Sequence, residues 1–318
     1  MWRYILKRLL MIIPVLVGVT FVVYMILSVA DGDPVQTILG DKATEEAQEQ
    51  LRAELGLDRP LIVQYGNYIW DALHGDFGTS YKNQVDVMDQ VLDRFPNTLL
   101  IAAGAILLSL VLGIPVGIIS AKKQYSFIDN ASMVGALFGV SMPAFWMGLL
   151  LVIVFSLKLR LLPSSGMNSE SLGLLLKSMI LPVIALSTYS LAMIARMTRS
   201  SMLEVIRQDY ISTARSKGIT EGRVTVRHML RNALIPIITA VGLQFGTLVG
   251  GSIMTETVFS WPGIGRLLVD CIGLKDTPVV VACVLVLATM FTIINLCIDI
   301  LYAFLDPRIR AQYKTAKR

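Results

Sequence analysis

Residues Tyr210–His228 read YISTARSKGITEGRVTVRH, and long apolar runs flank this polar stretch on both sides. Its arginines, lysines and small hydroxyl residues are too polar for the hydrocarbon core of a bilayer. The flanking runs, Ser178–Ala195 and Asn232–Met254, are each long enough to cross that core as a helix. The stretch therefore indicates a loop between two membrane spans, and its composition has to be explained by a role at the membrane surface.

The chain as a whole is strongly apolar. Of its 318 residues 54% are hydrophobic and 16% are charged, with a mean hydropathy of +0.65, which is too apolar for a soluble domain. The short alternating segments of a transmembrane barrel do not occur. We therefore predict an all-α integral membrane protein with six transmembrane helices: Leu9–Ala30, Asn97–Ala121, Ala131–Leu157, Ser178–Ala195, Asn232–Met254 and Val279–Leu305.

The first run has an alternative interpretation as a signal peptide. Basic residues precede it, and it ends in Ser28-Val29-Ala30, which resembles a cleavage site. A signal peptide has an apolar core of only about 7–15 residues, and this run is about twice as long. We interpret the run as a retained membrane anchor.

Lysine and arginine predict the orientation of the chain. Of the 28 basic residues, 18 fall before the first span, at 122–123, in the loop 196–231 or in the tail, all on one side of the membrane. The positive-inside rule makes that side the cytoplasm and places both termini there. The segment 31–96 carries thirteen acids against five bases, as expected for the outer side. The net charge of +5 thus reflects topology and does not indicate nucleic-acid binding.

The predicted domains follow from this topology: residues 1–30 form an N-terminal anchor, 31–96 an extracytoplasmic segment, 97–305 a five-helix core with a cytoplasmic loop at 196–231, and 306–318 a cytoplasmic tail. In the outer segment we expect one helix capped by Thr44 and ending at Gly56. A second helix runs from Pro60 to Gly75, with Tyr65, Ile69 and Leu73 on one face that packs against protein or the lipid interface.

Small and uncharged polar residues occur inside several predicted spans. Glycines four apart line one helix face and allow another backbone to approach closely, either for static packing or for sliding during transport. Gln244 and Asn295 either line a pathway or hydrogen-bond between helices. The glycines are Gly113, Gly117, Gly135, Gly139, Gly242, Gly246 and Gly250.

Catalytic and cofactor motifs are missing from the sequence. The two histidines, His74 and His228, lie on opposite sides of the predicted topology, and there is no HExxH, no GxSxG and no GxxxxGK[ST] phosphate loop. Cys271, Cys283 and Cys297 lack metal-ligand spacing and are predicted to be small buried hydrophobes. We therefore expect no catalytic site, metal or cofactor, and if ATP energises this protein, another chain must bind it.

An ion-coupled secondary carrier is the main alternative class. Such carriers place acids or bases deep in the bilayer. Asp299, near one end of the last span, is the one carboxylate well inside a predicted span, and we expect it to be solvated at the membrane edge or paired with a basic residue. An intramembrane enzyme is a third alternative, but no nucleophile–base pair supports it.

The loop 196–231 is predicted to be helical in its first half. Leu203, Ile206, Tyr210 and Ala214 recur at steps of three and four residues, and Gly218 is placed to end the helix in a left-handed cap. Small side chains gather before that end: Ser212, Thr213, Ala214 and Ser216. Together they allow the end of the helix to lie close to another surface.

This loop resembles the cytoplasmic signature of permease subunits in bacterial ATP-binding-cassette (ABC) importers, which has the form Glu-Ala-Ala, three residues, Gly, nine residues, Ile-x-Leu-Pro. Ser212-Thr213-Ala214 stands at the first element, Gly218 is the glycine, and His228–Arg231 stands at the last. Ser212, Thr213 and Arg231 depart from that general form.

Further stretches extend the resemblance over nearly the whole chain, to the branch that carries dipeptides, oligopeptides, nickel and glutathione, and most closely to the B-type subunit of dipeptide permeases. In that subunit the three departures are usual. The stretches are GDP (32–34), ELGLDRPL (54–61), GDFGTS (75–80), RMTRSSMLEVIRQDYISTARSKG (196–218), RHMLRNALIP (227–236), ETVFSWPGIGRLLVD (256–270) and LDPRIR (305–310).

The resemblance implies a type I importer permease in a bacterial cytoplasmic membrane, carrying short peptides or, alternatively, nickel complexes or glutathione. Its partners would be a second homologous permease, two ATP-binding subunits, an extracytoplasmic substrate-binding protein and membrane lipid. The residues implied in coupling to the ATPase are Tyr210, Ser212, Thr213, Ala214, Arg215, Lys217 and Gly218.

Overall fold

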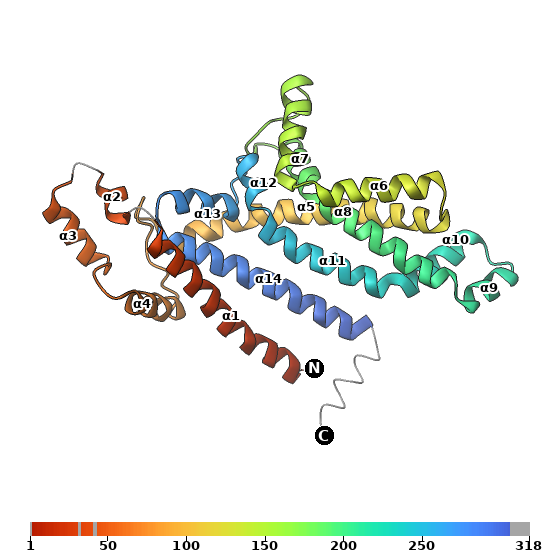
Figure 1. Ribbon diagram of the computed structural model, residues 1–318, viewed down its shortest axis with the longest axis horizontal. Helices are drawn as coiled ribbons and strands as arrows, with labels where there is room; N and C mark the ends of the chain where they lie inside the picture. Colours follow the sequence, from red (N-terminus) through yellow and green to blue (C-terminus); the bar gives the residue numbers. More distant parts are fainter. Residues whose placement is uncertain (1, 31–32, 41–42, 306–318) are drawn as a thin grey trace. The chain divides into compact units, whose positions relative to one another are not determined.

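A computed structural model of the protein describes residues 2–30, 33–40 and 43–305 (Figure 1). The chain forms two compact units, one made of residues 1–98 and 262–292 and the other of residues 99–261 and 293–318. Within the described residues the regular secondary structure is all helical, apart from an isolated antiparallel bridge between Thr79 and Asp86. The predicted cytoplasmic tail, 306–318, lies outside the described residues.

The first unit combines two long apolar helices with the short helices of the segment that follows the first of them. Its elements are α1 (Trp2–Val29), α2 (Pro34–Leu39), α3 (Glu45–Glu54), α4 (Leu61–Leu73), the start of α5 (Val87–Lys122), α13 (Ile264–Gly273) and the first part of α14 (Thr277–Leu305). The two helices predicted in the segment 31–96 are confirmed. Thr44 caps α3 by accepting a hydrogen bond from the Ala47 amide (3.3 Å), and α4 follows Pro60.

The second unit holds the remaining helices. They are the rest of α5, α6 (Phe127–Ser141), α7 (Ala144–Leu151), the π-helical segment η1 (Val152–Lys158), α8 (Leu172–Ile206), α9 (Asp209–Ser216), α10 (Glu221–Arg223), the π-helical segment η2 (Val224–Leu230), α11 (Arg231–Gly251), α12 (Ile253–Val258) and the end of α14.

Among the residues that the structure describes, five helical segments are long and apolar enough to span a membrane, and they match five of the six predicted spans: Arg8–Val29, Val87–Lys122, Leu172–Ile206, Glu221–Gly251 and Thr277–Ile298. The sixth prediction, Ala131–Leu157, is not one straight helix. The chain breaks before Pro143, which lacks an amide hydrogen, and α6 is bent by 103° from the helix that follows. The count of six holds when this bent pair is taken as one span.

Helix α8 is the centre of the second unit and packs against α6, α7 and α11 (Figure 1). Glycines bring its neighbours close, as the sequence predicted. A Cβ on Gly117 of α5 would lie 2.6 Å from the Ala195 carbonyl oxygen, and one on Gly139 of α6 would lie 3.1 Å from Ala192 Cβ. Gly135 faces open space instead. The four-residue glycine spacing therefore serves close helix packing at some positions and not at others.

Candidate functional site

The short helix α9 follows α8 after a break in the backbone. Gln208 is extended (φ −81°, ψ 143°), so the helical register of α8 does not continue into α9. As a result Ile211 is fully buried, whereas Tyr210 is 43% exposed. The prediction of one continuous apolar stripe through Tyr210 is therefore wrong, because it assumed a single uninterrupted helix.

The end of α9 has the geometry that the sequence predicted for Gly218. This residue has a left-handed backbone (φ +74°), and its amide donates to the Arg215 carbonyl (2.9 Å). The Ile219 amide donates to the Ala214 carbonyl (3.3 Å) and closes the turn. A Cβ on Gly218 would meet nothing within 4 Å, so glycine is required here by the backbone conformation and not by space within this chain.

The two faces of α9 differ sharply. Ile211 and Ala214 point into an apolar cluster with residues of α8, η2 and α11, including Met202, Met229 and Ile237. The opposite side is exposed and polar; we name it the coupling surface after the role that the resemblance implies, and it consists of Tyr210, Ser212, Thr213, Arg215, Lys217 and Gly218. Ala214, which the resemblance grouped with these residues, lies beneath them at 6% exposure and attaches α9 to the chain's own core.

Two polar contacts involve residues of the coupling surface. Arg215 Nε lies 2.8 Å from Glu221 Oε1 and pairs α9 with α10. Thr213 Oγ1 donates to the Asp209 carbonyl within the helix (3.0 Å). Because Arg215 and Glu221 are both solvent-exposed, their attraction is screened and contributes little to stability. Lys217 is exposed beside them and adds positive charge to this face.

An ion pair between a buried carboxylate and a partly exposed guanidinium joins helices of the second unit. Arg199 of α8 donates two hydrogen bonds to Asp129 of α6, from Nε to Oδ1 (2.6 Å) and from an η nitrogen to Oδ2 (2.8 Å). Asp129 is 1% exposed and also accepts hydrogen bonds from the Ser120 hydroxyl and the Tyr125 amide (2.9 Å). Four donors thus satisfy one buried carboxylate and join α5, α6 and α8.

The sequence analysis missed this clamp. A signal was present, because Ser126 and Asp129 form a Ser-x-x-Asp capping pattern directly before an apolar run, and Ser126 Oγ does accept from the Asp129 amide (3.3 Å). The pattern could have located Asp129 at a helix start, but not its partner 70 residues away. Glu256 of α12 is another buried carboxylate that was not singled out, and it accepts from the Ser252 hydroxyl (2.9 Å).

The residues predicted for a pathway or for helix packing fall into distinct environments on α11 and α14. A Cβ on Gly242 would lie 2.5 Å from Ile298 Cγ1, so α11 and α14 meet at this glycine. Gln244 is buried and its Oε1 accepts from the Ser190 hydroxyl of α8 (3.1 Å), which is an interhelical bond. Gly246 is buried, Gly250 faces open space, and Asn295 is half-buried.

A cavity of about 340 Å³ lies beside the break between α6 and α7. It is lined by the turn at Met142 and Pro143, by Tyr189 and Ser190 of α8, and by Thr247 and Gly251 of α11. None of the predicted residues lines it directly. Ser190 on its wall donates a hydrogen bond to Gln244, and the break that bends the span at Pro143 borders the same cavity.

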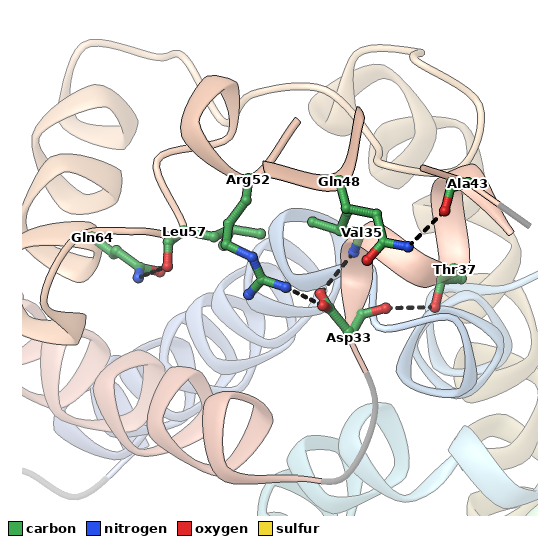
Figure 2. Close-up of polar contacts among 8 residues, drawn as sticks. All are labelled: Asp33, Val35, Thr37, Ala43, Gln48, Arg52, Leu57 and Gln64. Atoms are coloured by element: carbon green, nitrogen blue, oxygen red, sulfur yellow. Dashed lines mark hydrogen bonds and ion pairs between the residues drawn. The ribbon is translucent and has the colours of Figure 1, made fainter. Parts of the chain in front are cut away.

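The segment after α1 is ordered by polar contacts around Asp33, the central residue of the Gly-Asp-Pro sequence at 32–34 (Figure 2). Asp33 caps α2 by accepting from the Val35 amide (3.0 Å) and forms an ion pair with Arg52 of α3. Gln64 of α4 donates to the Leu57 carbonyl (3.2 Å) and so holds the loop that carries the ELGLDRPL stretch. The Asp33–Arg52 pair therefore joins α2 to α3, and the Gln64 bond joins α4 to the loop after α3.

The GDFGTS stretch is anchored to the residues before α14. Asp276 is fully buried and accepts hydrogen bonds from the Ser80 hydroxyl and from the Tyr81 amide (3.1 Å). Burial, with smaller effects of Tyr24 and Asp276, raises the pKa of the Tyr81 phenol well above its usual range, so the phenol is neutral. The end of this stretch thus binds a carboxylate that is distant in the sequence.

Two of the three cysteines behave as predicted. Cys271 and Cys283 are buried, and burial raises the pKa of the Cys271 thiol to about 12. Cys297 is exposed, so the prediction that it would be buried is wrong. Within residues 2–30, 33–40 and 43–305 no cluster of three or more histidine, cysteine, aspartate or glutamate side chains is placed to hold a metal ion. The side chain of Asp299 lies outside the described part of the chain.

Comparison with known proteins gives matches over nearly the full length. Residues 113–311 match the family model of the binding-protein-dependent transport system inner membrane component, and residues 1–102 match the model of its N-terminal region. The dipeptide transport system permease protein DppB of Alkalihalophilus pseudofirmus is 44% identical, covering 98% of this chain and 100% of the relative.

Two further comparisons agree with these matches. The glutathione transport system permease protein GsiC of Escherichia coli K12 is 42% identical, covering 98% of this chain and 99% of the relative. Among solved structures, an inward-facing MetNI methionine ABC transporter matches with a TM-score of 0.58 at 19% identity, over 69% of this chain and 97% of that one. The chain therefore belongs to the family of inner membrane components of binding-protein-dependent transport systems, the membrane-spanning permeases of ABC importers.

Proposed function

We propose that this chain is one of two homologous permease subunits in a bacterial ABC importer and that its coupling surface docks into a groove of a separate ATP-hydrolysing subunit. One observation carries the proposal: α9 is a short glycine-terminated helix that exposes a polar face while Ile211 and Ala214 attach it to the core. A solvated loop would have no need of such an attachment.

The attachment suggests how movement would pass through the molecule. Ile211 and Ala214 share their apolar cluster with α8, η2 and α11, so a displacement of α9 would be transmitted to these helices by close packing. The Asp129–Arg199 clamp would then carry the displacement from α8 to α6 and α5. Closure of two ATPase subunits around ATP would shift the core between inward-open and outward-open states.

The proposed cargo is short peptides. Support comes from the relatives named as dipeptide permeases, at 43% and 44% identity, and the relative named as a glutathione permease keeps glutathione as the alternative. Nickel complexes remain a further alternative from the resemblance of the sequence. A substrate-binding protein would deliver the cargo, and the acidic segment 31–96 is the surface that we expect it to contact.

The proposed orientation follows the distribution of basic residues. Both termini and the coupling surface lie in the cytoplasm, and the segment 31–96 lies outside. ATP hydrolysis would occur on partner chains, so this subunit would have no catalytic residues of its own.

Site-directed cross-linking to the ATPase subunit tests the proposed docking. Ser212→Cys places a thiol on the coupling surface, and Ala214→Cys places one beneath it, two residues away on the same helix. In the assembled transporter we expect Ser212→Cys to cross-link to a cysteine in the groove of the ATPase and Ala214→Cys not to do so. Solvent accessibility of Ser212→Cys without any cross-link to the ATPase would contradict the proposal.

A further inference from the structure

Helix α4 presents two apolar faces and only a narrow polar one. The first apolar face packs within the first unit, where Tyr65, Tyr68 and Ile69 contact residues of α1. The second is exposed: Ile62 is 75% exposed, Trp70 65% and Leu73 73%. At 100° per residue these three side chains lie within about 80° of one another around the helix. Asn67 and Asp71 lie on the polar face between the two.

The contacts of α4 fix its position along α1. Tyr65 Oη donates to the Val17 carbonyl (2.6 Å) and lies 2.9 Å from Thr20 Oγ1, and Tyr24 Oη donates to Gln64 Oε1 (3.0 Å). These α1 residues are well inside the apolar run Arg8–Val29. At 1.5 Å per residue, Thr20 and Tyr24 lie roughly 14 Å and 8 Å below Val29.

An apolar helix face at this depth meets the boundary between headgroups and acyl chains. The 22 residues of the α1 run are as long as the hydrocarbon core is thick, about 30 Å. An in-plane amphipathic helix sits about 5–10 Å into that boundary; Gln64 of α4 meets Tyr24 at this depth, and the Tyr65 side chain reaches deeper, to Thr20 and Val17. Tryptophan and tyrosine are enriched at this level of the membrane, and Trp70 is the aromatic residue on the exposed face.

We propose that α4 is an interfacial helix whose exposed face, Ile62, Trp70 and Leu73, binds membrane lipid in the leaflet that holds the C-terminal end of α1. On α1, Val22 and Ile26 are also exposed, 48% and 59%, within the membrane-spanning run. A lipid bilayer would cover these side chains of α1 and the exposed face of α4. The polar residues Asn67 and Asp71 would remain in water, and the tyrosine contacts would hold α4 against the span.

Spin-label accessibility in lipid bilayers tests this proposal on the assembled transporter. Cys297→Ser first removes the exposed native cysteine, since Cys271 and Cys283 are buried. Ile62→Cys and Leu73→Cys place a nitroxide on the apolar face, and Asn67→Cys and Asp71→Cys are matched controls on the same helix. We expect the first pair to collide several-fold more with oxygen, relative to a water-soluble nickel chelate, than the control pair.

Two outcomes would overturn the proposal. Equal access of the nickel chelate to all four labels would show that the face lies in water. Shielding of Ile62→Cys and Leu73→Cys from both reagents would show that another protein subunit covers it. A second measurement needs no label, because quenching of tryptophan fluorescence by brominated lipid should fall in Trp70→Phe relative to the unmodified transporter. An unchanged quenched fraction would also contradict lipid contact by Trp70.

Discussion

At the scale of single residues, the important positions are a glycine with a left-handed backbone and a carboxylate surrounded by donors. Gly218 has φ +74° with open space around it. Asp129 has almost no solvent exposure and accepts four hydrogen bonds. Backbone conformation restricts which residues position 218 tolerates, whereas burial restricts position 129. Substitutions at the two positions should therefore be harmful for different reasons.

For Gly218 we predict that conformation decides the effect of a substitution. A non-glycine residue in a left-handed backbone costs about 1–2 kcal/mol, and asparagine tolerates this conformation better than valine. Gly218→Val should lower transport relative to ATP hydrolysis more than Gly218→Asn, and both variants should insert and assemble normally. Uptake and ATPase rates of the reconstituted transporter measure this. A larger loss in Gly218→Asn than in Gly218→Val would point instead to contact with the partner.

For the Asp129–Arg199 clamp we predict a large loss of stability when one partner is removed. Arg199→Ala leaves the buried Asp129 carboxylate without its ion pair; because the Arg199 side chain is 23% exposed, the cost should lie below that of a fully buried pair, at roughly 1–3 kcal/mol. Arg215→Ala, which removes the exposed pair with Glu221, is the matched control and should change stability little. Thermal unfolding of the purified chain in detergent gives the comparison. Similar melting temperatures for the two variants would contradict the role given to the clamp.

At the scale of the elements, close backbone approach explains the packing of α11 on α14. Gly242 contacts Ile298, whereas Gly250 on the same helix faces open space. A stripe of glycines in the sequence therefore contains positions of very different sensitivity. Neighbouring positions of helix α9 also differ in sensitivity, because one side of this short helix packs in the core and the other side is exposed.

For α11 we predict that Gly242→Ala destabilises the protein by about 1–3 kcal/mol, the usual cost of overpacking, and that Gly250→Ala does not. The added Cβ of Gly242→Ala would lie 2.5 Å from Ile298 Cγ1, so either the Ile298 side chain or the two helices must shift. The double variant Gly242→Ala with Ile298→Ala should recover part of the loss. Thermal unfolding of the four proteins tests this, and equal effects at positions 242 and 250 would refute the close contact.

At the scale of the whole molecule, the helices divide into a first unit that carries the segment 31–96 and a second unit that carries α9. The matches to the two family models fall on residues 1–102 and 113–311. Each unit is held by contacts between residues far apart in the chain, such as Asp276 with Ser80 in the first and Arg199 with Asp129 in the second.

For the whole molecule we predict that this chain cannot accumulate substrate alone. Because the proposed energy source is a separate ATPase, purified chain in vesicles should not concentrate dipeptides on a proton gradient. The same vesicles should do so when the partner permease, ATPase subunits, binding protein and ATP are present. Uptake of labelled dipeptide measures both cases. Gradient-driven uptake by this chain alone would instead establish the carrier alternative.

The sequence by itself determined the membrane helices, the caps and the family. Long apolar runs must form helices in hydrocarbon, and residues such as Thr44 and Gly218 specify local backbone geometry through their own chemistry. These features depend on neighbours within a few residues, so they can be derived from the order of amino acids. The same reasoning located α9 and the turn at its end.

Only the tertiary structure decided which residues meet. The Asp129–Arg199 pair, the contact of Gly242 with Ile298 and the exposure of Cys297 depend on how helices pack, and no periodicity in the sequence encodes their partners. Because the helix breaks at Gln208, Ile211 is buried in the core where the sequence had predicted Tyr210. The bend before Pro143 likewise divides one predicted span into two helices. Helix propensity acts locally, whereas burial and backbone approach arise between segments that are distant in the chain, which is why these features could not be predicted.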